Sequence, residues 1–318
     1  MVAVLVIFAL SGLLVGCDRA GRTADIVRDR PQVVATTTIV GDIVARVGGE
    51  DIDLRVLLPP GADPHGYIFR PVDMTAAADA DVLFVNGAGL EGHLDRLVRT
   101  AGTRSVIALD RGIDVRRLPR PHTHDDHGHH DCQQCATGAT DPHFWFDPLN
   151  VKIWATTIAD ALTEIVPDRQ AAFEARAAQL QVELDELHEW IQQQVKLIPP
   201  ERRLLASDHK SFGYFADRYE FTEVGVILPS FDSMAQASAR HVGQLMDALR
   251  AQEIPAIFIG MNVNPNLAER ISRDSGVELV RLHTESLTDD DGTAPDYFAY
   301  MRYNVRKLVQ HLGVAATP

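Results

Sequence analysis

Two groups of short β-branched segments lie on either side of one long amphipathic stretch, and this arrangement limits the fold more than any other feature. Four predicted strands precede the stretch and four follow it, at residues 32–38, 53–58, 81–86, 105–109, 202–207, 222–227, 256–259 and 277–282. Helical patterns separate the strands, as in chains that build parallel sheets. We therefore expect an α/β protein with two lobes, each a four-stranded, mostly parallel sheet flanked by helices.

The long stretch between the two groups has the pattern of a single helix. From Asp168 to Val195, apolar residues recur at steps of three and four, with Glu and Gln between them. At 1.5 Å per residue such a helix spans roughly 40 Å, enough to run along both lobes. A coiled-coil dimer arm is the alternative, but the apolar seam covers only about four heptads. We expect a rigid helix over residues 167–197 that joins the lobes 31–166 and 198–318 of a monomer.

The N-terminus has the pattern of an export signal. Residues 1–16 are largely apolar, too few to cross a bilayer, and end in small residues directly before Cys17. No Lys or Arg precedes this run, which is a departure from the usual signal. We expect a lipoprotein-type signal peptide over residues 1–16, lipidation of Cys17, and a polar tether over residues 17–30. The protein is then exported, either periplasmic or lipid-anchored on the outer side of the cytoplasmic membrane.

The charge of the chain limits its partners. It has 30 basic and 44 acidic side chains, which gives a formal net charge of −14 at pH 7. A nucleic-acid partner would require a basic face, so we expect none.

Residues 117–140 differ in composition from the rest of the chain and are predicted to form a surface loop, because they lack apolar periodicity. Candidates for secondary, weak metal binding in this loop are His122, His124, His127, His129 and His130. A solvated loop without a ligand is the alternative. Cys132 and Cys135 form a Cys-x-x-Cys pair. In an oxidising compartment this pair favours a small disulfide over metal binding or redox catalysis.

Four potential metal ligands follow the carboxyl ends of predicted strands, where open α/β sheets place their ligand crevices. His65 follows the second strand, His143 the fourth, His209 the fifth and Glu285 the eighth. An Asp-Pro pair before each of the first two holds the imidazole on a stiff corner. Three imidazoles and one carboxylate form a four-coordinate site suited to Zn2+, whereas Mn2+ prefers more oxygen ligands. The sequence therefore predicts a zinc site between the lobes.

These segments also resemble a known family. The boxes Asp-Pro-His-Gly-Tyr at 63–67, Asp-Pro-His-Phe-Trp-Phe-Asp-Pro at 141–148, His-Lys-Ser-Phe-Gly-Tyr-Phe at 209–215 and Glu-Ser-Leu at 285–287 are similar to those of the zinc- and manganese-binding solute-binding proteins of ABC importers. The resemblance covers about residues 33–312. It implies a metal held between two lobes by His65, His143 and His209, and delivery of that metal to a membrane permease.

The resemblance also bears on the choice of metal. In the manganese branch of the family the third ligand position is usually Glu, so His209 indicates the zinc branch. The fourth position is commonly Asp, and Glu285 is one methylene longer. The family usually has Glu where Gly260 stands.

We expect an extracytoplasmic, high-affinity protein that captures Zn2+ as its cargo and presents it to an ABC-transporter permease without catalysis. A metallochaperone is a further candidate partner. Because metal-binding imidazoles must be neutral, the affinity is expected to fall below about pH 6.5. A secreted zinc hydrolase with Glu285 as its base is one alternative, which turnover of ester, peptide or phosphate substrates would identify. A manganese-binding homologue is the other, which metal analysis of protein purified without chelator would identify.

Overall fold

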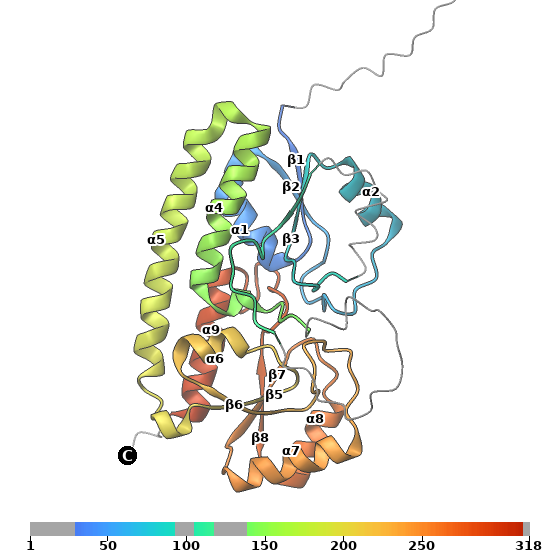
Figure 1. Cartoon of the computed structure of the whole chain (residues 1–318), viewed down its shortest axis with the longest axis vertical. Helices are drawn as coiled ribbons and strands as arrows, with labels where there is room; N and C mark the ends of the chain where they lie inside the picture. The colour runs from blue at the N-terminus through green and yellow to red at the C-terminus, as the bar shows by residue number, and fades with distance from the viewer. Residues whose placement is uncertain (1–28, 93–104, 118–138, 314–318) are drawn as a thin grey trace, which may run out of the picture.

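The computed structural model describes residues 29–92, 105–117 and 139–313. Within them the chain forms two lobes stacked along the long axis of the molecule (Figure 1). The first lobe contains β1 (Gln32–Ala35), β2 (Asp53–Val56), β3 (Val82–Val85) and β4 (Val106–Ala108). The second contains β5 (Leu204–Ser207), β6 (Thr222–Val226), β7 (Ala256–Gly260) and β8 (Glu278–Leu282). The predicted fold class of two four-stranded sheets is confirmed.

Both sheets are parallel and share one topology. The strand orders are β2-β1-β3-β4 and β6-β5-β7-β8, so the first strand of each lobe lies inside its sheet. The shorter helices are α1 (Thr38–Gly48), α2 (Pro71–Asp79), α6 (Gly213–Tyr219), α7 (Ala239–Ala251) and α8 (Asn266–Ser275). The loops that leave the carboxyl ends of the strands face the region between the lobes, which is where parallel sheets gather functional residues.

The first strand is shorter than the sequence pattern predicts. It ends at Ala35, and the expected continuation to residue 38 is wrong, because Thr37 begins the next helix instead. The Thr37 hydroxyl oxygen accepts a hydrogen bond of 3.2 Å from the backbone N–H of Val40. Such a cap satisfies a donor at the start of α1 that has no partner within the helix.

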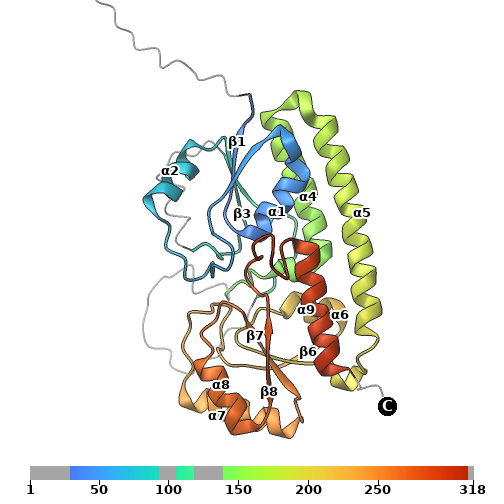
Figure 2. The same ribbon diagram turned by 180° about the vertical axis from the view of Figure 1, so that it is seen from behind.

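A pair of long helices runs beside the lobes: α4 (Pro148–Ile165) and α5 (Gln170–Val195). The chain then ends in α9 (Tyr297–Leu312), which lies next to α5 (Figure 2). Helix α5 extends alongside both lobes, as expected of a rigid connection (Figure 1). It begins three residues later than the predicted start at residue 167, because Pro167–Arg169 forms a separate 3-10 turn, η4.

The buried face of α5 is the apolar stripe expected from the sequence. Its buried residues are Phe173, Ala177, Leu180, Leu184, Leu187, Ile191 and Val195. They belong to a hydrophobic core that continues through both lobes. Between the lobes, the ring of Phe146 packs 4.7 Å from that of Phe212 and 5.8 Å from that of Tyr300. Aromatic packing of this kind gives the two lobes a shared apolar contact.

Several predictions fall on residues that the structure does not describe. The signal peptide, Cys17, most of the tether and residues 118–138 with their histidines and the Cys132–Cys135 pair lie outside the described residues. No helix in the described part of the chain is both long enough and apolar enough to cross a bilayer.

Candidate metal centre

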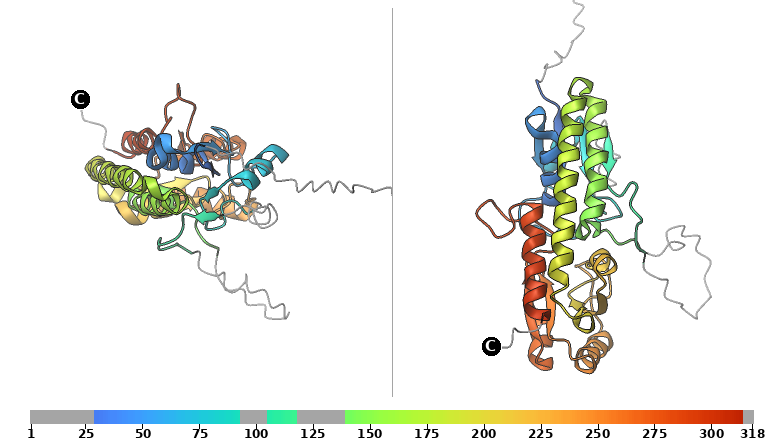
Figure 3. Two further views of the ribbon diagram at one scale, coloured as in Figure 1. Left: turned by 90° about the horizontal axis from the view of Figure 1, so that it is seen from above. Right: turned by 90° about the vertical axis from the view of Figure 1, so that its left-hand side faces the viewer.

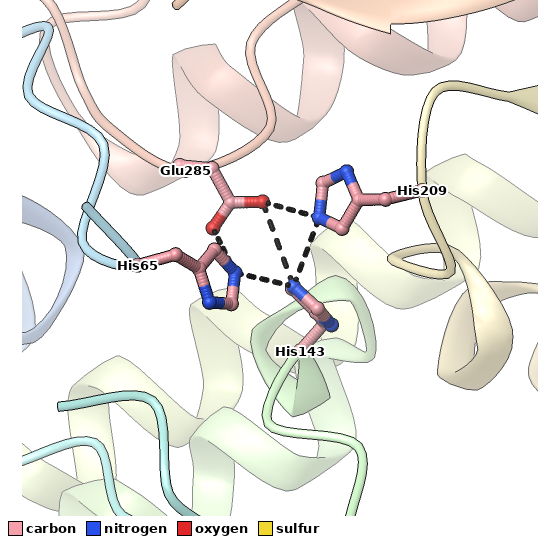
Figure 4. A group of neighbouring side chains, drawn as sticks. All are labelled: His65, His143, His209 and Glu285. Atoms are coloured by element: carbon pink, nitrogen blue, oxygen red, sulfur yellow. Dashed lines mark hydrogen bonds and ion pairs between the residues drawn. The ribbon is translucent and has the colours of Figure 1, made fainter. Parts of the chain in front are cut away.

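His65, His143, His209 and Glu285 converge between the two lobes (Figure 4). One ligand atom from each lies within 4.8 Å of those from the other three. His65 lies in the loop after β2, and His143 directly precedes the 3-10 turn η3 (Phe144–Phe146). His209 and Glu285 follow β5 and β8. The structure therefore brings together all four residues predicted as ligands, two from each lobe.

The distances within this cluster are those of ligands around a small ion. The Nε2 atom of His143 lies 3.2 Å from Nε2 of His209 and 3.3 Å from Nε2 of His65. The Glu285 Oε1 atom lies 3.1 Å from Nε2 of His209 and 3.5 Å from that of His143. Glu285 Oε2 lies 3.8 Å from Nε2 of His65. Four ligands bonded tetrahedrally at 2.0–2.1 Å would be about 3.3 Å apart. The spacing thus suits a four-coordinate divalent ion.

The cluster is almost completely removed from solvent. His143 and His209 are fully buried, Glu285 is 2% exposed, and only the side chain of His65 retains 6% exposure. Neither carboxylate oxygen of Glu285 has a hydrogen-bond partner among the described residues. A buried carboxylate without hydrogen bonds is costly unless a cation lies beside it. The two oxygens therefore indicate that a positive charge completes this site.

Protonation can supply that charge when no metal is bound. Burial lowers the pKa of His209, but the carboxylates of Asp208 and Glu285 more than offset this, and the pKa is raised well above its ordinary value. The pKa of His143 is raised in the same way, against burial, by Glu285 and Asp141. Burial raises the pKa of Glu285, but the three imidazoles hold it well below its usual range. For His65, burial dominates and lowers the pKa.

Two aspartates orient the imidazoles of the buried histidines. Asp141 Oδ1 lies 2.8 Å from Nδ1 of His143 and also accepts its backbone N–H. Asp208 Oδ1 lies 3.1 Å from Nδ1 of His209 and accepts the backbone N–H of the same residue. A carboxylate at Nδ1 places the proton there and turns the Nε2 lone pair toward the metal position. His65 differs, because Asp63 accepts a hydrogen bond from its backbone N–H and does not contact its ring nitrogens.

These aspartates were not predicted as part of the site. An acidic residue one or two positions before a candidate ligand is the signal that could have found them. Asp208 also accepts the backbone N–H of Gly260 at 3.1 Å. A Cβ atom at Gly260 would lie 2.4 Å from Oγ1 of Thr284, so a glutamate does not fit at this position. Tight packing behind the site thus explains the departure from the family pattern.

The aromatic residues after His143 pack beside it and connect the lobes. Trp145 is buried, and its indole N–H donates to the carbonyl of Thr284 at 3.2 Å and to the hydroxyl of Tyr300 at 3.0 Å. The Tyr297 hydroxyl donates to the carbonyl of Trp145 at 2.6 Å. The segment that carries His143 is therefore fixed to the β8–α9 region of the other lobe.

Two side chains of the opposite lobe contact the loop that carries His65: Ser286, whose hydroxyl accepts the backbone N–H of Gly61 at 2.9 Å, and Ser233. The hydroxyl of Ser233 donates to Oδ2 of Asp63 at 2.6 Å. Beside this contact, Met234 packs closely against Gly66: a Cβ atom added at Gly66 would lie only 3.0 Å from the Met234 sulfur. A cavity of about 640 Å³, lined by His65 and by residues of both lobes, opens next to this contact. His65 is thus the ligand nearest to a path from solvent.

The fold and this cluster define a two-lobed binding protein whose site suits a divalent metal ion. A family model described as "ZnuA: Zinc-uptake complex component A periplasmic" matches residues 33–311, and the chain belongs to this family. Membership confirms the predicted class, a metal-binding, substrate-binding protein of ABC importers, and its extracytoplasmic location.

Some relatives of this chain are named as manganese-binding proteins and one solved structure as a zinc-binding protein. The manganese-binding lipoprotein MntA of Halalkalibacterium halodurans is 29% identical over 311 residues, with 98% of this chain and 97% of the relative covered. The manganese ABC transporter substrate-binding lipoprotein PsaA of Streptococcus pneumoniae is 26% identical, with 97% of each covered. The periplasmic zinc-binding protein TroA of Treponema pallidum is 26% identical with a TM-score of 0.79, over 90% of this chain and 100% of that one.

Proposed function

We propose that this protein captures Zn2+ outside the cytoplasm and delivers it to an ABC-type permease. The observation that carries the proposal is the meeting of three imidazole nitrogens and one carboxylate, all within 4.8 Å of one another, in a buried site. Such a donor set and its near-tetrahedral spacing are typical of zinc. Zn2+ is then the transported substrate, bound and released without covalent chemistry.

The competing cargo is Mn2+, which the names of MntA and PsaA favour. Manganese prefers octahedral surroundings rich in oxygen, and this cluster offers one carboxylate to three nitrogens. Affinity alone does not separate the two, since nitrogen and oxygen sites bind zinc more tightly than manganese in general. The cargo is therefore better identified in the cell.

Growth of a strain lacking this protein tests the cargo. We expect the strain to grow poorly in zinc-depleted medium, and we expect added zinc, but not added manganese, to restore its growth. Protein purified without chelator should contain zinc. Expression of wild-type protein should restore growth, whereas His209→Ala should not. Rescue by manganese, with manganese in the purified protein, would assign the other metal.

We propose that the protein is not an enzyme. In a hydrolase the fourth zinc position would hold water, with Glu285 as a nearby base. Here Glu285 Oε1 lies as close to His209 Nε2, at 3.1 Å, as the imidazoles lie to each other. This supports a role for Glu285 as the fourth ligand. The relatives named above are binding proteins by name, which gives the hydrolase alternative no support.

The anchor and the His-rich segment complete the proposal. Lipidation of Cys17 would tether the protein beside its permease, in accord with the lipoprotein names of its relatives. The histidines of residues 118–138 would bind metal weakly and transfer it to the buried site. The monomeric state, the Cys132–Cys135 disulfide and a metallochaperone partner stay predictions.

Asp141→Asn and Asp208→Asn are each expected to weaken zinc binding roughly 10- to 100-fold, because each removes the carboxylate that orients a buried imidazole. Competition titration against a chelator of known affinity measures the change. Asp274→Asn is the matched control, since the Asp274 side chain is 54% exposed and pairs with Arg270 on α8, away from the proposed ligands. Unchanged affinity in both test variants would show that the aspartates do not support the metal ligands.

Ser233→Ala is expected to accelerate zinc release roughly 10- to 100-fold, the effect of losing one hydrogen bond to a charged group. The hydroxyl contacts the loop of His65 two residues before this candidate ligand, so its loss weakens the hold on His65 and leaves the contacts of the other three in place. Stopped-flow transfer of zinc to an excess of chelator gives the release rate. Ser275→Ala, on α8, serves as control, because among the described residues the Ser275 hydroxyl bonds to Ile271 of its own helix and to Val277 of the following turn. Equal release rates for both variants would contradict a role for this contact.

Zinc affinity is expected to keep rising with pH above 6.5, the ordinary imidazole value. The raised pKa values of His143 and His209 mean that protons still compete with zinc above pH 6.5, and each displaced proton contributes up to about tenfold in affinity per pH unit. Titrations between about pH 6 and 8 test this; a constant affinity would contradict it.

The stability of the metal-free protein should show the opposite trend. The contribution of these protonated histidines to the free energy of unfolding is complete at low pH and is lost as the pH rises through their folded-state pKa.

A further inference from the structure

Helix α9 lies beside α5 (Figure 3, right), and it carries a group of basic residues. Arg302, Arg306 and Lys307 line a cavity of about 520 Å³, and Thr293, Tyr303 and Gln310 are among the other lining residues. We call this the α9 basic cavity. None of its lining residues belongs to the proposed metal site or to the cavity beside His65.

The three cations lack acidic partners, although the chain has 44 acidic side chains against 30 basic ones. Among the described residues, no carboxylate lies within 4.0 Å of Arg302, Arg306 or Lys307. Asp296 also lines the cavity, but its Oδ1 accepts the backbone N–H of Ala299 and its Oδ2 lies 3.6 Å from Arg46. The positive charge in this cavity is therefore not balanced by the described part of the chain.

The helix itself does not stabilise the positive charges of these residues. Arg302 and Arg306 are four residues apart on α9, a spacing at which like charges repel. The helix dipole favours cations only within the last turn, and the basic residue there is His311. An anion from solution would remove the repulsion and balance the charge.

The aromatic neighbours of these cations do not neutralise their charge. Arg302 and Arg306 lie 5.9 and 5.7 Å from the ring of Trp190, which is part of α5. The ammonium of Lys307 lies 5.8 Å from the ring of Tyr303. A cation over an aromatic ring keeps its charge and its N–H donors, which can still bind a planar or tetrahedral oxyanion. Two arginines and a lysine around one cavity are the groups that proteins use to bind phosphate.

We propose that the α9 basic cavity is a second ligand site, which binds a phosphate-class oxyanion. The anion would bind Arg302 and Arg306, which lie over the ring of Trp190 on the linking helix. Free phosphate and the head group of an anionic phospholipid share this chemistry. The site does not depend on the identity of the transported metal.

Calorimetric titration of the zinc-loaded chain with inorganic phosphate, against chloride at equal ionic strength, tests the site. We expect saturable binding of one phosphate, weakened at least about tenfold in an Arg302→Gln/Arg306→Gln variant that loses two charge-assisted contacts. Lys307→Gln, which keeps both arginines, is a second variant with a smaller expected loss. The matched control is Arg270→Gln/Arg273→Gln on α8, where each arginine already pairs with a carboxylate, Asp274 or Glu269. Zinc affinity should be the same in all four proteins.

Sedimentation with vesicles separates the two sources of phosphate. Binding to phosphatidylglycerol vesicles but not to phosphatidylcholine vesicles, lost in the Arg302→Gln/Arg306→Gln variant, would identify a lipid head group. Binding of free phosphate without vesicle binding would identify a soluble anion. Binding that is absent in both experiments, or that the α9 variants leave unchanged, would overturn the proposal.

Discussion

Replacement of His143 by alanine is expected to lower zinc affinity by roughly 100- to 1,000-fold. Protein zinc sites contribute about 10–16 kcal/mol through four ligands, or about 2.5–4 kcal/mol for each, and each 1.4 kcal/mol is about a factor of ten in affinity. His143 is the residue to remove, because its Nε2 lies within 3.5 Å of the ligand atoms of His65, His209 and Glu285. Competition titration with a chelator measures the loss.

His188→Ala is the matched control for this experiment. His188 is a partly buried histidine on α5 whose Nδ1 lies 3.0 Å from the hydroxyl of Tyr219, in a contact that does not involve the cluster. Its removal should leave zinc affinity unchanged. A His143→Ala protein that binds zinc as tightly as wild type would mean that the ion is held elsewhere in the chain.

Saturation with zinc should raise the melting temperature by about 8 °C. At a free metal concentration 1,000 times Kd, binding to the folded state alone contributes about 4.1 kcal/mol, and 1 kcal/mol corresponds to about 2 °C in a chain of this size. The effect arises because the ligands come from four separate segments in two lobes, and the ion therefore holds distant parts of the fold together. Calorimetry with and without zinc measures the shift.

Two controls show whether this stabilisation belongs to the buried site. His143→Ala at the same zinc concentration should shift by no more than about 3 °C, because its roughly 100- to 1,000-fold weaker affinity leaves zinc at only about 1 to 10 times Kd. Magnesium, which avoids imidazole ligands, should not stabilise the wild-type protein. Equal shifts for the wild type and the variant would assign the effect to other binding sites.

The parts of the fold that follow from local patterns could be predicted from the sequence. The β-branched runs identified the eight strands, and the apolar spacing identified the buried face of α5 down to its residues. The four cluster residues could be found because parallel sheets place functional groups after the carboxyl ends of their strands. This rule relates residues that are far apart in the chain, such as His65 and Glu285, without knowledge of their contacts.

The remaining features depend on contacts that no local pattern contains. Asp208 orients His209 only because the backbone N–H of Gly260, from a neighbouring strand, holds its second oxygen. Ser233 reaches Asp63 across 170 positions of sequence. The pairing of α9 with α5, which places Arg302 over Trp190, likewise arises from packing between distant helices. Side-chain positions of this kind require the three-dimensional arrangement.

The most direct test of the account is a crystal structure of the zinc-loaded protein with anomalous scattering measured at the zinc edge. We predict one strong peak between the lobes, at about 2.0–2.2 Å from Nε2 of His65, His143 and His209 and from an oxygen of Glu285. A zinc peak outside this cluster, or one bonded to fewer than three of its histidines, would contradict the proposed site and with it the proposed role in zinc capture.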